Sequence, residues 1–209
     1  MQKEPHTLQA EDIVRQLFKQ GYSIELDEYD AEHAKRTAML TELMLKTLAR
    51  QRRPKALTDA VIANIITAAR LHNIGKALIW PKYEPITAPK EAHTTLGSKK
   101  MIEALWESNI DIDLLSCIFM VVRNHHERWD GKGYPDRLKG TKIPFAVQIV
   151  SLASYYDQLC FNRNQETSLS YKAAAKIITQ QTGHAFSPST VRLFLHSGDA
   201  IQRCFYPQA

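Results

Sequence analysis

Five histidines occupy positions whose sequence context suits metal binding. Neutral imidazole is the commonest metal ligand at physiological pH, and histidines on separate helices can meet inside a helical bundle. A lone histidine is more often an ordinary structural residue, so the prediction depends on the group and above all on the adjacent pair. The five candidates are His33, His72, His93, His125 and His126, whereas His6, His184 and His196 have no such context.

The segment His72-Asn73-Ile74-Gly75-Lys76 follows an apolar stretch. Gly75 is a candidate for the residue that terminates a helix there. Lys76, just beyond it, would direct a cation toward whatever the histidines bind. The alternative is an ordinary helix C-terminus, where a lysine stabilises the negative end of the helix dipole, and these residues fit it equally well.

Apolar residues recur at helical spacing through nearly the whole chain, and alternating strand patterns are essentially absent. We expect Asp30 to cap the second helix and Thr58 to start the third. Residues 80–90 contain prolines and residues 124–144 contain both glycines and prolines, so both are predicted loops. The fold class is therefore all-α, with helices predicted over residues 8–20, 30–50, 58–71, 95–107, 112–123, 145–160, 171–181 and 189–196.

The 209 residues suit one domain that can bury a core unaided. We predict an N-terminal helical extension over residues 1–29 and a single domain over residues 30–209. With 44% hydrophobic and 23% charged residues, the chain is neither disordered nor of low complexity.

The sequence predicts a cytoplasmic protein that binds neither membranes nor nucleic acid. No apolar run reaches the roughly 18 residues of a membrane span, and residues 1–10 lack the apolar segment of a signal peptide. The net charge of +5 suits anionic ligands such as phosphates, or simply a solvated surface. The basic run at 50–55 has no aromatic residues for stacking on bases. Three cysteines, all expected to be buried thiols, indicate a reducing compartment: Cys117, Cys160 and Cys204.

Residues 125–135, HHERWDGKGYP, resemble the HD-GYP domain, whose signature is HHExxDGxGYP. The resemblance continues through residues 138–144 (LKGTKIP against LxGxxIP) and 153–159 (ASYYDQL against ADxxDAL). Upstream, HNIGK at 72–76 resembles the family's HDIGK. Residues 183–188 resemble the closing GxxFDP, with Ser187 in place of its aspartate. The chain is identified as a member of this family over roughly residues 30 to 200.

The resemblance implies an HD-domain helical bundle with a long GYP loop. Such proteins hydrolyse the bacterial messenger cyclic di-GMP with two or three metal ions, often iron or manganese. The implied catalytic residues are His72 and Lys76, with Lys76 and Arg163 on the phosphate, while Tyr134 would face the substrate or a protein partner. The implied metal ligands are His33, His72, His93, His125, His126 and the residues at positions 73 and 154.

Two of those positions lack the family's carboxylates, because Asn73 replaces one aspartate and Ser154 the other. Two divalent cations about 4 Å apart repel by about 16 kcal/mol at an effective dielectric constant near 20. An amide and a hydroxyl do not offset that repulsion as carboxylates would. We therefore expect at most one ion per chain, held by His93, His125 and His126, or none.

Three further positions bear on this site. Tyr29 stands where trinuclear members have a glutamate, and Glu166 where a second basic residue is found. Asp157, one helical turn after Ser154, could reach the site, but it matches the family's own second aspartate and we interpret it as structural.

The sequence hypothesis is an HD-GYP-like domain of cyclic di-GMP signalling with impaired catalysis. It would act by binding the nucleotide, or a protein partner through the GYP loop. Two alternatives stay open. One is an active metal-dependent cyclic di-GMP phosphodiesterase, and the other is a different HD-type phosphohydrolase with a mononuclear site.

Overall fold

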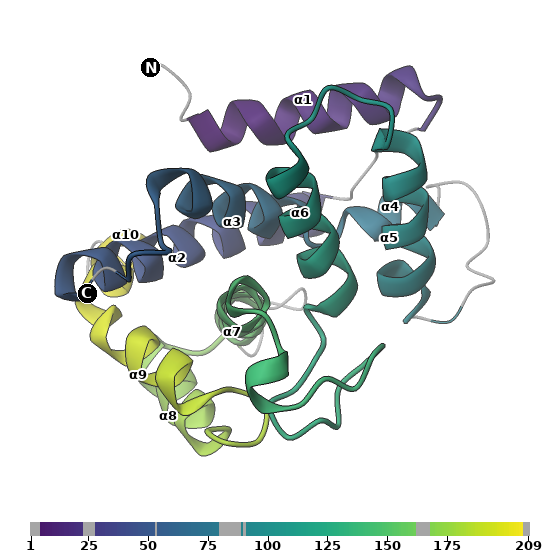
Figure 1. Ribbon diagram of the computed structural model, residues 1–209. Coiled ribbons are helices and arrows are strands. Elements are labelled where there is room, and N and C mark those ends of the chain that lie inside the picture. The colour runs from purple at the N-terminus through teal and green to yellow at the C-terminus, as the bar shows by residue number, and fades with distance from the viewer. Residues whose placement is uncertain are drawn as a thin grey trace.

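The computed structural model describes residues 5–22, 28–52, 54–79, 89, 91–161 and 168–206 (Figure 1). These residues contain no β-strand and only one isolated β-bridge, between Thr182 and Phe186, which confirms the all-α fold class. The helices are α1 (Pro5–Lys19), α2 (Glu28–Arg52), α3 (Asp59–Leu71), α4 (Ile74–Ile79), α5 (Ala92–Leu105), α6 (Ile112–Asn124), α7 (Phe145–Cys160), α8 (Tyr171–Gln180), α9 (Pro188–His196) and α10 (Gly198–Phe205), with a 3-10 turn, η1 (Gly140–Lys142).

The long helix α2 lies at the centre of the bundle and packs against both α3 and α7 (Figure 1). Helix α6 packs against α3 and α5, and α4 packs closely on α5. Helix α1 crosses one end of the bundle on α3 and α5, while α8 to α10 gather at the opposite end. This arrangement buries large apolar side chains such as Met44, Ile118 and Tyr156 in one core. It also brings α2, α3, α5, α6 and α7 together around a common centre.

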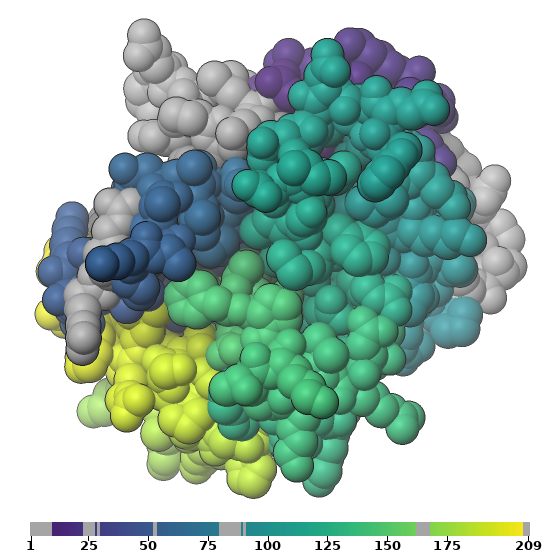
Figure 2. Space-filling view, viewed as in Figure 1, coloured from purple at the N-terminus to yellow at the C-terminus, as the bar shows by residue number. Residues whose placement is uncertain are grey.

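The connection between α6 and α7, the GYP loop, lies on the face shown in Figure 2, between the α5–α6 pair and the C-terminal helices. None of the described helices is both long and apolar enough to cross a lipid bilayer. Cys117 and Cys160 are buried as expected, but Cys204 is exposed, so that prediction is wrong for one thiol. The domain boundary at residue 29 stays a prediction.

Of the two helix starts expected from capping residues, one is confirmed and one is wrong. The Thr58 side chain accepts a hydrogen bond from the Val61 amide at 3.2 Å, which confirms it as the cap of α3. The expectation for Asp30 is wrong. Helix α2 already begins at Glu28, and the Asp30 carboxylate instead pairs with Lys76 Nζ at 3.0 Å.

Gly75 does not terminate a helix, contrary to the sequence prediction. Helix α3 ends earlier, at Leu71, and Gly75 lies inside the separate short helix α4. A Cβ atom on Gly75 would collide with the backbone carbonyl of His93, and a Cβ atom on Gly97 would collide with the backbone of Gly75. Glycine is needed here because the α4 and α5 backbones touch, not because the chain turns.

Candidate functional site

The structure brings together all five histidines that the sequence singled out. His33 comes from α2, His72 follows α3, and His93 lies in the first turn of α5. His125 caps the C-terminus of α6, and His126 follows it. The Nε2 atoms of His33 and His72 are 3.2 Å apart, and those of His93 and His125 are 3.4 Å apart. The rings of His72 and His125, 5.2 Å apart, join the two pairs into one cluster.

His93, His125 and His126 form a group suited to a metal ion, because each offers a ring nitrogen and these atoms all lie within 4.8 Å of one another. The Nδ1–H of His125 donates to the carbonyls of Val121 and Val122, at 3.1 and 3.0 Å. Nδ1 therefore carries the hydrogen, and Nε2 presents a lone pair toward the group. These residues fit a divalent ion.

Burial keeps the imidazoles of His125 and His126 neutral. It lowers the pKa of His125 well below the usual value, and neighbouring His126 adds to the effect. Burial, together with the charges of His93 and Lys76, lowers the pKa of His126 to about 3. Metal ligation requires the unprotonated imidazole, so near neutral pH these two side chains are already in the ligand form.

The other half of the cluster consists of His33, His72 and Ser154. His72 donates its Nδ1–H to the Ala69 carbonyl at 2.8 Å. Ser154 Oγ lies 3.1 Å from His33 Nε2 and 3.4 Å from His72 Nε2. Asn73 is buried beside His72. Where the resemblance implies a carboxylate, this half therefore presents a hydroxyl and an amide.

Asp157 does more than the structural role expected from the sequence. Its buried Oδ2 accepts from His33 Nδ1 at 2.6 Å. Arg36 donates to both carboxylate oxygens, at 2.6 and 3.2 Å, and its guanidinium lies 4.7 Å from the centre of the Phe161 ring. Sequence reasoning missed Arg36. The available signal was its position three residues after His33, on the same face of α2.

The remaining predicted site residues differ in how they are placed. Lys76 pairs with Asp30. Burial lowers the pKa of both His72 and His126, and the positive charge of Lys76 adds to the effect. Tyr134 stacks on His126 with ring centres 4.8 Å apart and planes 23° apart, and burial raises its pKa to about 12. Arg163 and Glu166, together with the Tyr29 side chain, lie outside what the structure describes.

We expect Tyr134→Ala to weaken metal binding about 3- to 10-fold, because the stacked ring holds His126 in place and such contacts contribute about 0.5–1.5 kcal/mol. Tyr134→Phe keeps the ring and should bind like the wild type. Competition titration with a chromophoric chelator measures both. Equal weakening by the two variants would mean that the hydroxyl, rather than the stack, matters.

Glu127, the third residue of the HHE motif, holds the GYP loop in place through hydrogen bonds. Its buried carboxylate accepts from the backbone N–H groups of Asp136 at 2.7 Å and Leu138 at 3.0 Å. The amides of Trp129 and Asp130 donate to the carbonyls of Ala185 and His184. These two hydrogen bonds tie the loop to the α8–α9 connection.

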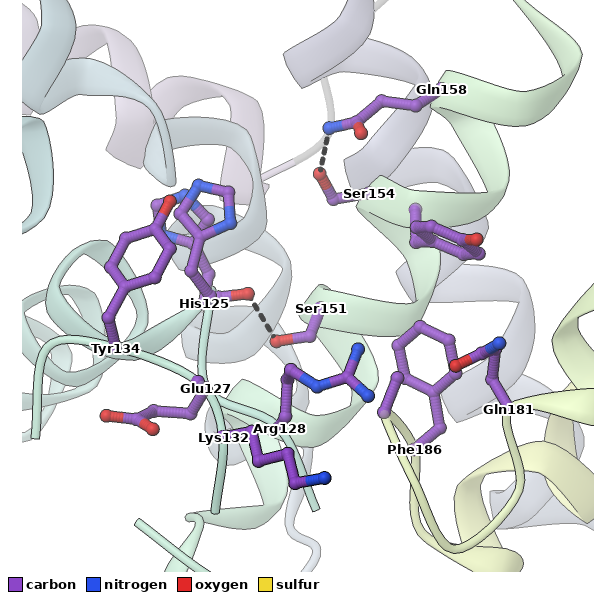
Figure 3. A pocket seen from close by; sticks show the side chains of 14 residues that line it. His125, Glu127, Arg128, Lys132, Tyr134, Ser151, Ser154, Gln158, Gln181 and Phe186 are labelled. Carbon is purple, nitrogen blue, oxygen red and sulfur yellow. Dashed lines mark hydrogen bonds between the residues drawn. The ribbon is translucent and has the colours of Figure 1, made fainter. Parts of the chain in front are cut away.

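A cavity of about 300 Å³ opens beside His125 and His126 (Figure 3). Basic and amide side chains on its wall suit an anionic ligand, and two aromatic rings offer flat apolar surface. These side chains are Arg128, Lys132, Gln158, Gln181, Tyr155 and Phe186, and Ser151 and Ser154 of α7 also line the cavity. Arg128 is itself paired with Asp130 at 3.0 Å.

Histidines from four helices and their ends meet inside this bundle, next to a GYP loop that hydrogen bonds hold in place. This arrangement is typical of an HD-type domain. Comparison agrees: a family model described as HD domain matches residues 25–190. The chain belongs to the HD domain family, and its likeness to the HD-GYP proteins is confirmed.

Among curated relatives, the chain is 34% identical over 149 residues to a cyclic di-GMP phosphodiesterase of Vibrio cholerae, covering 66% of this chain and 30% of that protein. It is 28% identical over 145 residues to a 3'3'-cGAMP-specific phosphodiesterase of the same organism, covering 68% and 28%. The chain therefore spans about a third of the length of these relatives.

Among solved structures, an HDG"Y"P protein from Bdellovibrio bacteriovorus matches with a TM-score of 0.58 and 18% identity, over 83% of this chain and 52% of that one. This match supports the fold.

Proposed function

We propose that this chain is an HD-GYP-type domain of cyclic di-GMP signalling whose phosphodiesterase activity is impaired and which acts mainly by binding. Relatives that are cyclic di-GMP phosphodiesterases support the nucleotide as ligand. The observation that carries the impairment is the Ser154 hydroxyl, which stands between His33 and His72 where the family places an aspartate. Without that carboxylate, this half of the cluster lacks the negative charge that a second divalent ion needs.

The cavity has the side chains that a cyclic dinucleotide requires. Lys132 and Arg128 on its wall would attract and contact phosphate oxygens, and the rings of Tyr155 and Phe186 would pack against a base. His93, His125 and His126 would hold one divalent ion, with iron or manganese expected from the resemblance. When bound, that ion supplies a Lewis acid for a phosphate oxygen.

The test is a calorimetric titration with cyclic di-GMP, with and without Mn²⁺ or Fe²⁺, combined with chromatography for hydrolysed product. We expect saturable binding with little or no turnover. Lys132→Gln should weaken binding about tenfold, because it removes a charged contact. The matched control Lys142→Gln, an exposed lysine in η1, should not. Absence of binding under every metal condition would refute a nucleotide ligand, and rapid turnover would refute the impairment.

Two other outcomes follow from specific observations. One relative is a 3'3'-cGAMP-specific phosphodiesterase, so 3'3'-cGAMP is the second nucleotide to titrate. In that case the domain would act as a phosphohydrolase with a single metal ion. A protein partner bound through the GYP loop is the other way in which the domain could act. Because the loop is fastened by Glu127, such a partner would meet a preformed surface.

A further inference from the structure

We propose that Ser154, His33 and Asp157 form a metal-independent nucleophilic triad that reacts with small anionic esters. The inference goes beyond the proposed cyclic di-GMP function and uses none of the three histidines assigned to the metal ion. It arises from the replacement of an aspartate by Ser154, which puts a hydroxyl beside a histidine that already has a carboxylate partner.

The geometry matches what an activated serine requires. The distance from Ser154 Oγ to His33 Nε2 is 3.1 Å, and that from His33 Nδ1 to Asp157 Oδ2 is 2.6 Å. Nucleophile and base are within hydrogen-bond reach, and the base is oriented by a third group. Ser154 and Asp157 lie one turn apart on α7, and His33 faces both from α2. Arg36 fixes Asp157 from the far side through two hydrogen bonds.

The hydrogen bonds also determine where the protons lie. A carboxylate only accepts, so His33 Nδ1 carries a hydrogen, and the imidazole form of the ring then has its lone pair on Nε2. The Ala69 carbonyl fixes the same tautomer in His72. The Ser154 O–H is therefore the donor to these nitrogens, and the nearer acceptor is His33 Nε2. His72 Nε2, 3.2 Å from His33 Nε2, would accept from the imidazolium that forms when His33 takes the Ser154 proton.

Ser154 is also reachable from outside, because it lines the cavity described above (Figure 3). The amide nitrogen of Gln158 lies 3.5 Å from Ser154 Oγ, which puts an N–H donor beside the position where an oxyanion would form. Lys132 and Arg128, which also line this cavity, favour a negatively charged ester over a neutral one.

The reaction balances without a metal ion or redox partner. Ser154 Oγ attacks the ester carbonyl, its proton passes to His33 Nε2, and the alcohol leaves with that proton. Water then attacks the acyl-serine ester and loses a proton to His33 Nε2, which passes it to Ser154 Oγ as the acid leaves. Asp157 and Arg36 are positioning residues in both steps, because Asp157 holds His33 and Arg36 holds Asp157, and neither touches the substrate.

The first experiment treats the purified protein, in excess EDTA, with a fluorophosphonate, which transfers its phosphonyl group to an activated serine and releases fluoride. Intact mass should increase by one phosphonyl group, and peptide fragmentation should locate it on Ser154. Ser154→Ala should abolish labelling. The matched control Ser151→Ala removes a hydroxyl on the same cavity wall that donates to the His125 carbonyl, and it should label within twofold of the wild-type rate.

The second experiment compares two esters of similar size, 4-nitrophenyl succinate and neutral 4-nitrophenyl butyrate, in EDTA. Release of 4-nitrophenol should be at least tenfold faster with the succinate, and Ser154→Ala should remove the difference. Asp157→Asn should slow labelling about 100-fold or more because it frees the His33 tautomer, and a melting curve shows that the variant is folded.

Three results would overturn the triad: no adduct on folded wild-type protein, an adduct on another residue, or labelling that survives Ser154→Ala. None of them bears on the proposed function, since the probe requires neither the nucleotide nor the metal ion. Conversely, absence of cyclic di-GMP binding leaves the labelling result unaffected.

Discussion

Restoring both carboxylates, with Asn73→Asp and Ser154→Asp, should raise the metal content from at most one ion per chain to two. Ser154 Oγ already lies 3.1 Å from His33 Nε2 and 3.4 Å from His72 Nε2, so an aspartate there would present an oxygen beside the two nitrogens. The two added charges offset the repulsion of about 16 kcal/mol between neighbouring divalent ions. Elemental analysis after purification without chelators measures the change.

The same double variant should gain hydrolysis of cyclic di-GMP or of bis-4-nitrophenyl phosphate, by tenfold or more over the wild type. Each single change should do much less, because neither alone corrects the charge deficit and the two positions act on one site. Wild-type turnover equal to that of the double variant would show that Asn73 and Ser154 never limited catalysis. A folded double variant that still binds one ion would direct attention to Tyr29 and Glu166.

Removing one of the three assigned ligands should release the ion altogether. We expect His126→Ala to weaken metal affinity more than 100-fold, since losing even an outer-shell partner costs 10- to 100-fold. His33→Ala should keep the ion, because His33 belongs to the half that lacks its carboxylate. Measured metal content after dialysis, and competition with a chelator, distinguish these outcomes.

His184→Ala is the matched control for the loss of a histidine, because His184 is exposed and outside the cluster. It should bind the ion like the wild type. The opposite pattern, with release by His33→Ala and retention by His126→Ala, would show that the ion sits in the His33–His72 half.

The sequence predicted the bundle and the histidines well because each depends on local pattern. Helical periodicity located most helices, and the HHExxDGxGYP block identified the adjacent histidines. The Arg36–Asp157 pair could not be predicted in this way, since its members lie 121 residues apart and meet only when α2 packs on α7. Gly75 was misinterpreted because its constraint is the backbone of α5, which no local rule includes. Helix α10 was missed because it starts almost directly after α9, where Ser197 and Gly198 suggest a stop.

Two serines replace family aspartates, with opposite consequences. Ser187 caps α9, and its Oγ accepts from the Thr190 amide at 3.1 Å, a role that serine performs as well as aspartate. Ser154 stands instead where charge is needed, and a hydroxyl does not supply it. Under the proposed function, the same substitution is thus neutral at a helix end but removes a negative charge at the ion site.

The direct backbone contact of Gly75 with α5 has a mechanical consequence. No flexible side chain lies between the two helices at this point, so α4 and the first turns of α5 must move together as one rigid body. His72 immediately precedes α4, and His93 lies in the first turn of α5. Main-chain contact therefore sets the backbone spacing between these two histidines, one from each half of the cluster.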